Sequence, residues 1–249
     1  MAELHISAVP GIPDVTAGDD LATLIADAVE RGRFGVAAGD VFVVAQKIVS
    51  KAEGAIVRLA DVVPSPLAEK WAAAHNKDAR AVEVIFRESR RIVRMDHGVI
   101  IAETRHGFIC ANAGVDASNV PAGFVTLLPR EPDASAARLR EALSAACGCP
   151  IAVIVADTFG RPWREGAVNV ALGVCGIRGL LDYRGCRDPY GRWLESTIIA
   201  LADELASAAE IVMRKTTRTP VALVRGAAEW AGAGSGQELL RKAARDLFR

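Results

Sequence analysis

An apolar run that ends in a carboxylate and a hydroxyl is the part of this sequence that most clearly points to chemistry. Residues 151–156 are all apolar and include several β-branched side chains, which predicts a buried strand. Asp157 and Thr158 follow at the end of this run. Because hard cations prefer oxygen ligands, the carboxyl end of the predicted strand is a candidate metal site.

The next eight residues, 159–166, read FGRPWREG and hold an unusual density of functional groups. Arg161 and Arg164 offer planar guanidinium groups, which bind phosphate or carboxylate through paired hydrogen bonds. If Asp157 were the only polar residue here, a strand end followed by a solvated loop would be a sufficient explanation. The whole string favours a functional loop.

Two further groups of polar residues are candidates for the same site. Lys47 and Lys51 flank an apolar pair directly after a predicted strand at residues 40–45. Lysines at this spacing are usually solvated, but at least one of them could turn into a site. Asp116 and Asn119 lie among turn-forming residues, so an Asx-rich turn explains them as well as a second carboxylate for the cation does.

Composition excludes several classes of protein. The chain has 249 residues, 51% of them apolar, and its 30 basic residues balance 30 acidic ones. This balance gives no bulk electrostatic reason to bind nucleic acid or an anionic membrane. No apolar run approaches the roughly 18 residues of a membrane span, and no signal peptide is visible at the N-terminus. We therefore expect a cytoplasmic protein without nucleic-acid or membrane partners.

Cysteines, histidines and glycine-rich motifs add no site. Five scattered cysteines are an odd number, which indicates free thiols rather than a disulfide framework, and the four histidines have no metal-binding spacing. The sequence lacks a phosphate-binding loop of the G-x-x-x-x-G-K-[ST] type, and its glycine cluster at 232–236 does not follow a strand. A nucleotide would need a binding cradle of another kind.

Periodicity and capping signals predict the remaining elements. We find no linker that marks a domain boundary and no internal repeat. A charged loop is expected at 182–192 and a hairpin at 92–103. Helices are predicted at 21–32, 65–76, 133–146 and 195–213, with a basic amphipathic helix at 234–249, and strands at 40–45, 151–156, 168–175 and 220–224.

Five strings in this order resemble one family, the coenzyme F420-0:L-glutamate ligases: VPGIP, VVAQKIVSKAEG, ANAGVDASNV, VIVADTFGRPWREG and LLDYRGCRDPYGR. The resemblance covers residues 4–249. It implies an α+β fold of mixed sheets with flanking helices, and a homodimer. It also implies one ligase domain over residues 1–249, either undivided or built from two intertwined α+β subdomains. The flavin-binding domain that follows the ligase in some relatives is not expected here.

The resemblance also implies a reaction. Members of the family join L-glutamate through its amine to the deazaflavin coenzyme F420-0, and further γ-linked glutamates can follow. GTP drives the step together with Mg²⁺ or Mn²⁺, and K⁺ helps. In our own interpretation of this reaction, an acyl phosphate would form first, with Arg161 and Arg164 neutralising anionic charge on the phosphates or the acceptor. The matching positions are Ile12, Pro13, Asp14, Val15, Gln46, Lys47, Lys51 and Asn119 for the nucleotide, and Asp116, Asp157 and Thr158 for the metal.

One stretch departs from the family pattern. After the long helix the family usually has Met-Gly-Gln or Met-Gly-Lys, whereas this chain has Met213-Arg214-Lys215, followed by residues 216–218. Arginine lacks the backbone freedom of glycine, which puts the nucleotide contact of this loop in question.

Two alternatives to this reaction stay open. The same scaffold could act on a different acceptor or amino acid, or the protein could be a non-catalytic nucleotide-binding regulator. The intact metal set argues against the second alternative, because binding alone rarely needs it.

Overall fold

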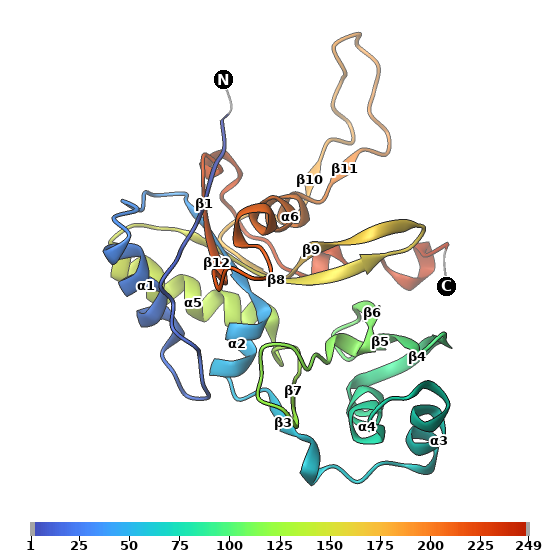
Figure 1. The fold of residues 1–249 in the computed structure, drawn as a ribbon. Coiled ribbons are helices and arrows are strands. Elements are labelled where there is room, and N and C mark those ends of the chain that lie inside the picture. The colour runs from blue at the N-terminus through green and yellow to red at the C-terminus, as the bar shows by residue number, and fades with distance from the viewer. Residues whose placement is uncertain (1–2, 248–249) are drawn as a thin grey trace.

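A mixed five-stranded sheet forms the centre of the computed structural model, which describes residues 3–247 (Figure 1). In sheet order its strands are β1 (His5–Ala8), β12 (Val221–Arg225), β2 (Val41–Ala45), β8 (Ala152–Arg161) and β9 (Arg164–Cys175). β2 and β8 are parallel neighbours, whereas the other neighbouring strands are antiparallel.

Helices cover both faces of this sheet because its central strands are apolar on both sides. In β2, Phe42 and Val44 pack into the core on one face, and Val41 and Val43 pack into the core on the other. The first face carries α1 (Leu21–Arg31), α2 (Gln46–Ala52) and α5 (Pro132–Cys147), and the second carries α6 (Leu201–Met213).

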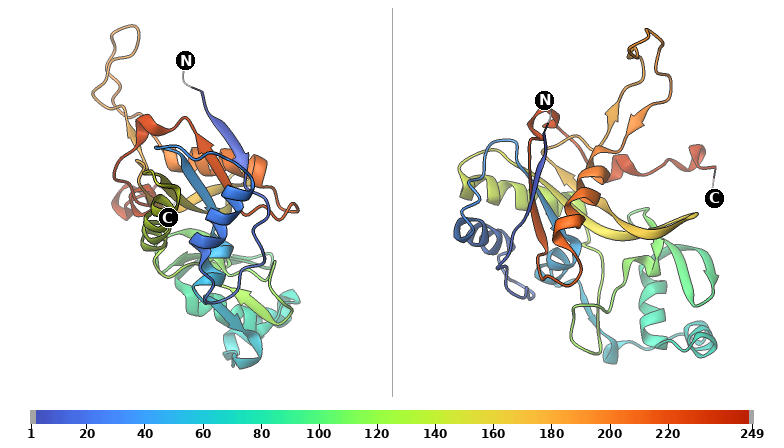
Figure 2. Two further views of the ribbon diagram at one scale, coloured as in Figure 1. Left: turned by 90° about the vertical axis from the view of Figure 1, so that its left-hand side faces the viewer. Right: turned by 45° about the horizontal axis from the view of Figure 1, so that its top comes forward.

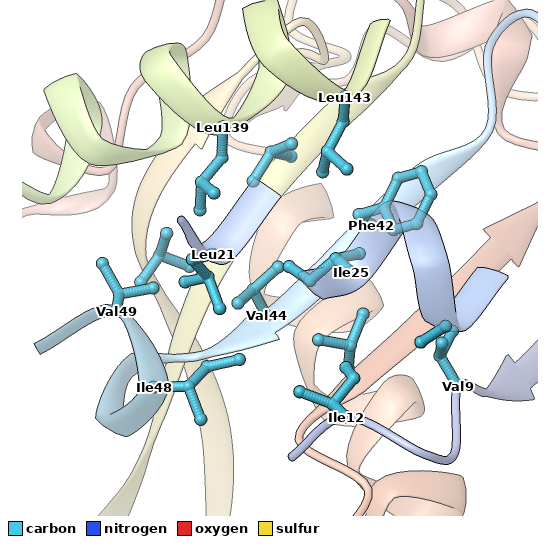
Figure 3. Packing of buried hydrophobic residues seen from close by; sticks show 14 of the residues in the cluster. Val9, Ile12, Leu21, Ile25, Phe42, Val44, Ile48, Val49, Leu139 and Leu143 are labelled. Atoms are coloured by element: carbon cyan, nitrogen blue, oxygen red, sulfur yellow. The ribbon is translucent and has the colours of Figure 1, made fainter. Parts of the chain in front are cut away.

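The core on the first face is the larger one (Figure 3). Leu143 of α5 and Ile25 of α1 lie around Phe42 of the central strand, and all three are fully buried. Each side chain of this size contributes roughly 1.5–3 kcal/mol when it leaves water. Val9 and Ile12 of the N-terminal segment close the same core.

Residues 56–126, here called the insert, lie between α2 and α5 and pack around cores of their own. In Figure 1 the insert hangs below the central sheet. Trp71 and Ile100 belong to one of these cores, and Leu59 and Val84 to the other. Its elements are β3 (Ile56–Arg58), η1 (Leu59–Asp61), α3 (Pro66–His75), α4 (Ala79–Glu88), β4 (Ser89–Asp96), β5 (Val99–Thr104), β6 (Ile109–Ala111), η2 (Asn112–Gly114) and β7 (Phe124–Thr126).

A small apolar cluster joins the insert to the long β8–β9 hairpin. Phe108 of the insert lies edge-on to Phe159 of β8, with ring centroids 6.3 Å apart, and packs with Leu172 of β9. Leu240, from the C-terminal segment, packs against the same cluster. The insert is therefore held to the sheet by side-chain packing as well as by the chain itself.

Residues 181–199, here called the arm, project from the body of the molecule (Figures 1 and 2). Only two short strands, β10 (Leu181–Asp182) and β11 (Ile198–Ile199), pair at its base. The charged loop predicted at 182–192 forms most of the arm.

Most predicted elements are confirmed, and so is the α+β class with mixed sheets and flanking helices. The hairpin predicted at 92–103 is β4–β5, and the strand predicted at 168–175 is the second half of β9, with Gly173 inside it. A Cβ at Gly173 would lie 2.1 Å from the carbonyl oxygen of Pro132, so only glycine lets α5 begin this close to β9. Helices α2 and α4 were not predicted.

The prediction that the central strand ends before Asp157 is wrong. β8 continues through Asp157 and Thr158 to Arg161, and β9 returns after a two-residue turn at 162–163. The predicted loop 159–166 is thus the end of a hairpin. The polar residues stay in strand conformation because β9 supplies an antiparallel partner to each of them, beginning with Val170 opposite Asp157.

Two predicted helices also differ from the structure. The helix predicted at 195–213 begins only at Leu201, because Ile198 and Ile199 pair with the base of the arm. The predicted C-terminal helix consists, up to residue 247, of the short turns η4 (Gln237–Leu239) and η5 (Ala243–Arg245), and residues 248–249 lie outside the described part.

The C-terminal segment is held extended by its contacts with the sheet. A Cβ at Gly236 would lie 2.0 Å from the carbonyl oxygen of Leu172, so backbone meets backbone there. Glu238 accepts a hydrogen bond of 2.9 Å from the Gly179 amide. A further turn, η3 (Ala228–Trp230), precedes this segment. Within residues 3–247, no helix combines the length and the apolar character that crossing a membrane requires.

A buried ion pair ties the beginning of β2 to the end of β12. Asp40 is 2% exposed and accepts hydrogen bonds from the Ala37 amide at 2.9 Å and from Arg225 Nη2 at 2.8 Å. Removing one partner of a buried pair leaves a charge without compensation, which costs about 3–5 kcal/mol when both partners are fully buried.

We expect Arg225→Met to lower the free energy of unfolding by about 1–3 kcal/mol, less than the fully buried value because Arg225 is 43% exposed. Urea denaturation of both proteins measures the difference. Arg80→Met is the matched control, since Arg80 and Asp78 form an exposed pair whose loss should cost less than about 1 kcal/mol. If both variants lose the same free energy of unfolding, the Asp40–Arg225 pair stabilises the fold no more than an exposed pair does.

Candidate functional site

The predicted site residues of three segments meet at the carboxyl ends of the parallel strands β2 and β8. Ala45, the last residue of β2, pairs with Ala156, so the first turn of α2 with Lys47 begins beside Asp157. Asp116 of the insert lies within electrostatic range of Asp157. The carboxyl edge of parallel strands is a common place for ligand sites.

Lys47 and Asp116 form the closest charged contact of the site. Lys47 Nζ lies 2.6 Å from Asp116 Oδ2 and also donates to Ser118 Oγ. The Ser118 amide donates to Asp116 Oδ1 at 2.7 Å. Burial raises the pKa of Asp116, but the Lys47 ammonium and the Ser118 hydrogen bonds outweigh burial and leave the pKa below its usual value. The negative charge of Asp116 is therefore balanced by the Lys47 ammonium and by hydrogen bonds from Ser118.

Asp157 has the opposite electrostatic character. Burial raises its pKa to about 6, and the nearby Asp116 charge adds to this effect, although a backbone hydrogen bond and the charges of Lys47 and Lys215 oppose it. The Asp157 charge in turn adds to the burial that raises the pKa of Cys110 to about 12. A desolvated carboxylate of this kind gains much from a bound cation.

Thr158 contacts two residues that were not predicted for the site, Asn169 and Lys215. Its hydroxyl donates to Asn169 Oδ1 at 2.7 Å and accepts a hydrogen bond from Lys215 Nζ. Lys215 Nζ also lies 3.0 Å from Glu210 Oε1 of α6. A buried asparagine within the apolar strand 168–175 was the available sequence signal for Asn169.

Lys215 reaches the site because of an unusual backbone at Arg214. Arg214 has φ 55° and ψ 174°, a conformation that normally requires glycine. The loop that departs from the family pattern in sequence therefore keeps a glycine-like conformation. The sequence left open whether this loop touches a phosphate, and Lys215 was not among the predicted site residues.

Other predicted residues have side chains engaged elsewhere or lie apart from this cluster. Gln46 is buried and donates to Ser50 Oγ at 2.6 Å and to the Leu127 carbonyl at 2.8 Å, so its side chain holds the end of the insert. Arg161 Nη2 donates to the Glu165 carbonyl at 2.8 Å, within the hairpin.

The remaining predicted residues are placed as follows. Ile12 and Val15 pack in the core, Pro13, Asp14 and Arg164 are exposed, Lys51 is partly exposed in the last turn of α2, and Asn119 is exposed with φ 59°.

The donor set at the edge of the sheet fits a hard divalent cation. Asp116, Asp157 and Thr158 offer two carboxylates and a hydroxyl, all oxygen ligands. Among residues 3–247 there is no group of three or more histidine, cysteine, aspartate or glutamate residues that could enclose a metal by itself. An ion here would complete its shell with water or substrate oxygens, which is typical of Mg²⁺ sites that bind phosphates.

Comparisons with known proteins identify the family of this chain. The model of the family described as F420-0:Gamma-glutamyl ligase matches residues 11–226. A protein of Methanothermobacter thermautotrophicus named coenzyme F420:L-glutamate ligase is 47% identical, covering 99% of both chains. Proteins of the same name from Methanopyrus kandleri (47% identical; 99% of this chain, 98% of the relative) and Methanocaldococcus jannaschii (42%; 85% of each) are also similar. The chain belongs to the F420-0:gamma-glutamyl ligase family.

Proposed function

We propose that this protein is a GTP-dependent ligase that joins L-glutamate to coenzyme F420-0. The names of its relatives give the two substrates. The observation that carries the proposal for this chain is the cluster at the carboxyl edge of β2 and β8, where Asp116 and Asp157 lie beside Lys47 and Lys215. Oxygen ligands and ammonium groups in one place are what a metal–triphosphate complex requires.

The reaction needs an activated carboxylate, because carboxylates are poor acylating groups at neutral pH. In our proposal the acceptor carboxylate of F420-0 takes the γ-phosphoryl group of GTP and releases GDP. The glutamate amine then attacks the acyl carbon, forms the amide bond, displaces phosphate and loses its proton. The ammonium groups of Lys47 and Lys51 would bind phosphate oxygens and hold the triphosphate against the sheet edge. Arg161 and Arg164, on the hairpin, would face the acceptor's anionic groups.

Mg²⁺ or Mn²⁺, held by Asp116, Asp157 and Thr158, would neutralise charge on the transferred phosphoryl group. The oxygen donors of this chain support a divalent cation, whereas K⁺ enters the proposal from the family resemblance. Free cysteines fit a reducing compartment, which supports the cytoplasm as the location.

The arm supports the proposal of a homodimer. Tyr190 is 91% exposed and Trp193 is 58% exposed, although aromatic side chains of this size are usually buried. The Arg187 guanidinium lies 4.1 Å from the Trp193 ring centroid. Exposed aromatic and arginine side chains are enriched at protein interfaces, so we propose that the arm contacts a second copy of the chain.

The product assay tests the reaction. We expect the purified chain, supplied with F420-0, L-glutamate, GTP and Mn²⁺, to form F420-0 extended by glutamate, as mass spectrometry of the products would show. Asp157→Asn should lower turnover by about 10²-fold or more, because the variant loses one charge of the cation site. Asp61→Asn, on the exposed side of the insert, is the control with unchanged turnover.

Each other outcome points to one of the alternatives. Turnover of GTP with a different acceptor or amino acid would favour the same scaffold with another substrate. Tight GTP binding without any product would favour a regulator. If Asp157→Asn keeps full activity at limiting Mn²⁺, Asp157 is not a ligand of the cation.

A double replacement on the arm tests the dimer. We expect Tyr190→Ser with Trp193→Ser to shift the protein toward the monomer, raising the dimer dissociation constant at least tenfold, because buried aromatic side chains dominate interface energies. Sedimentation equilibrium measures this constant. Val63→Ser with Leu67→Ser, on the exposed surface of the insert, is the matched apolar control. A dimer that is equally stable in both double variants would place the interface elsewhere.

A further inference from the structure

Two of the three side chains that would bind a cation, Asp116 and Thr158, are already bonded to lysines. Asp116 Oδ2 accepts from Lys47 Nζ at 2.6 Å, and Thr158 Oγ1 accepts from Lys215 Nζ. The Thr158 hydroxyl gives its hydrogen to Asn169, so its lone pairs face the Lys215 ammonium. Both lysines are close enough to stabilise the Asp157 carboxylate.

A divalent ion that enters this site alone has to displace both ammonium groups from their oxygen partners. The displaced lysines would remain near the metal, and like charges at such distances repel each other. A polyphosphate that arrives with the metal removes this difficulty, because each ammonium then finds phosphate oxygens. Displacing the two ammonium groups therefore costs free energy when the metal binds without polyphosphate. The same displacement costs little when metal and polyphosphate bind together.

Both lysines are built to change partners. Lysine has a flexible stem and a compact ammonium with three donors, so it can exchange one oxygen for another without a fixed geometry. The Lys215 side chain is 61% exposed, and Glu210 at 3.0 Å gives it a second partner at the rim of the site. Lys47 is 21% exposed and lies in the first turn of α2, so the helix holds its backbone while the ammonium moves.

We propose that Lys47 and Lys215 act as exchangeable counter-ions that make binding of the divalent cation depend on binding of a nucleoside triphosphate. In the nucleotide-free protein the lysines occupy two of the cation's three ligands, Asp116 and Thr158. When metal and triphosphate bind together, each ammonium moves from a protein oxygen to a phosphate oxygen. This inference rests on the proposed function for the identity of the anion, but the displacement of lysine by metal is a property of the protein alone.

Calorimetric titration with Mn²⁺, with and without a non-hydrolysable GTP analogue, tests the exchange in the full-length protein. For the wild type we expect the analogue to tighten Mn²⁺ binding by about 5–150-fold, the usual range of coupling between two ligands. Lys215→Met keeps most of the stem and removes the ammonium. It should bind Mn²⁺ alone about tenfold more tightly than the wild type and show a smaller enhancement by the analogue.

Three further variants make the test specific. Lys47→Met should change Mn²⁺ binding in the same direction as Lys215→Met. Lys215→Arg keeps the positive charge, so without nucleotide it should bind Mn²⁺ as weakly as the wild type does. Lys70→Met, on the exposed side of α3, is the control with unchanged titrations. Melting curves confirm that each variant is folded.

Unchanged or weaker Mn²⁺ binding in Lys215→Met and Lys47→Met, in the absence of nucleotide, would overturn the proposal. So would a full enhancement by the analogue in both variants. If the wild type binds no guanine nucleotide, the proposed GTP dependence fails. The nucleotide-free Mn²⁺ titrations would then still decide whether lysines occupy the cation's ligands.

Discussion

The parallel pairing of β2 and β8 is the constraint on which the rest of the structure depends. Parallel neighbours cannot be joined by a tight turn, so the chain must cross from the end of one strand to the beginning of the other. Here α2 leaves the carboxyl end of β2, and α5 returns the chain to the beginning of β8. The insert interrupts this crossover before the return helix, and this is why Asp116 lies at the same edge as Asp157.

The difference between the two aspartates follows from this arrangement. Asp116 comes from a loop and brings its own hydrogen-bond donors, including Ser118, while Lys47 compensates its charge. Asp157 comes from a buried strand, and burial is the largest effect on its pKa. The pKa of one carboxylate thus lies below its usual value, and the pKa of the other lies above it. Local environment, rather than residue type, assigns the two roles.

Much of the framework could be predicted from sequence, because buried strands and amphipathic helices have periodic patterns. The meeting of Asp116 with Asp157 was one of two open interpretations, since an Asx-rich turn explained Asp116 equally well. The extension of β8 beyond Ala156 could not be predicted, because only the antiparallel partner β9 keeps polar residues in a strand. The C-terminal segment has a helical pattern, yet Gly236 and Glu238 anchor it against the sheet. Lys215 escaped prediction because Arg214 adopts a glycine-like conformation that its residue type disfavours.

The cluster of Phe108, Phe159 and Leu172 is the place where the insert and the sheet share apolar packing. The insert has cores of its own, so it could loosen from the sheet without unfolding itself or the sheet. Since Asp116 belongs to one part and Asp157 to the other, a ligand that binds both can bind only while the two parts are docked. Occupancy of the site then stabilises the docked state by mass action. In the proposed function, a substrate complex bound to both aspartates would therefore also fasten the insert to the sheet, in addition to the apolar cluster and the Lys47–Asp116 ion pair.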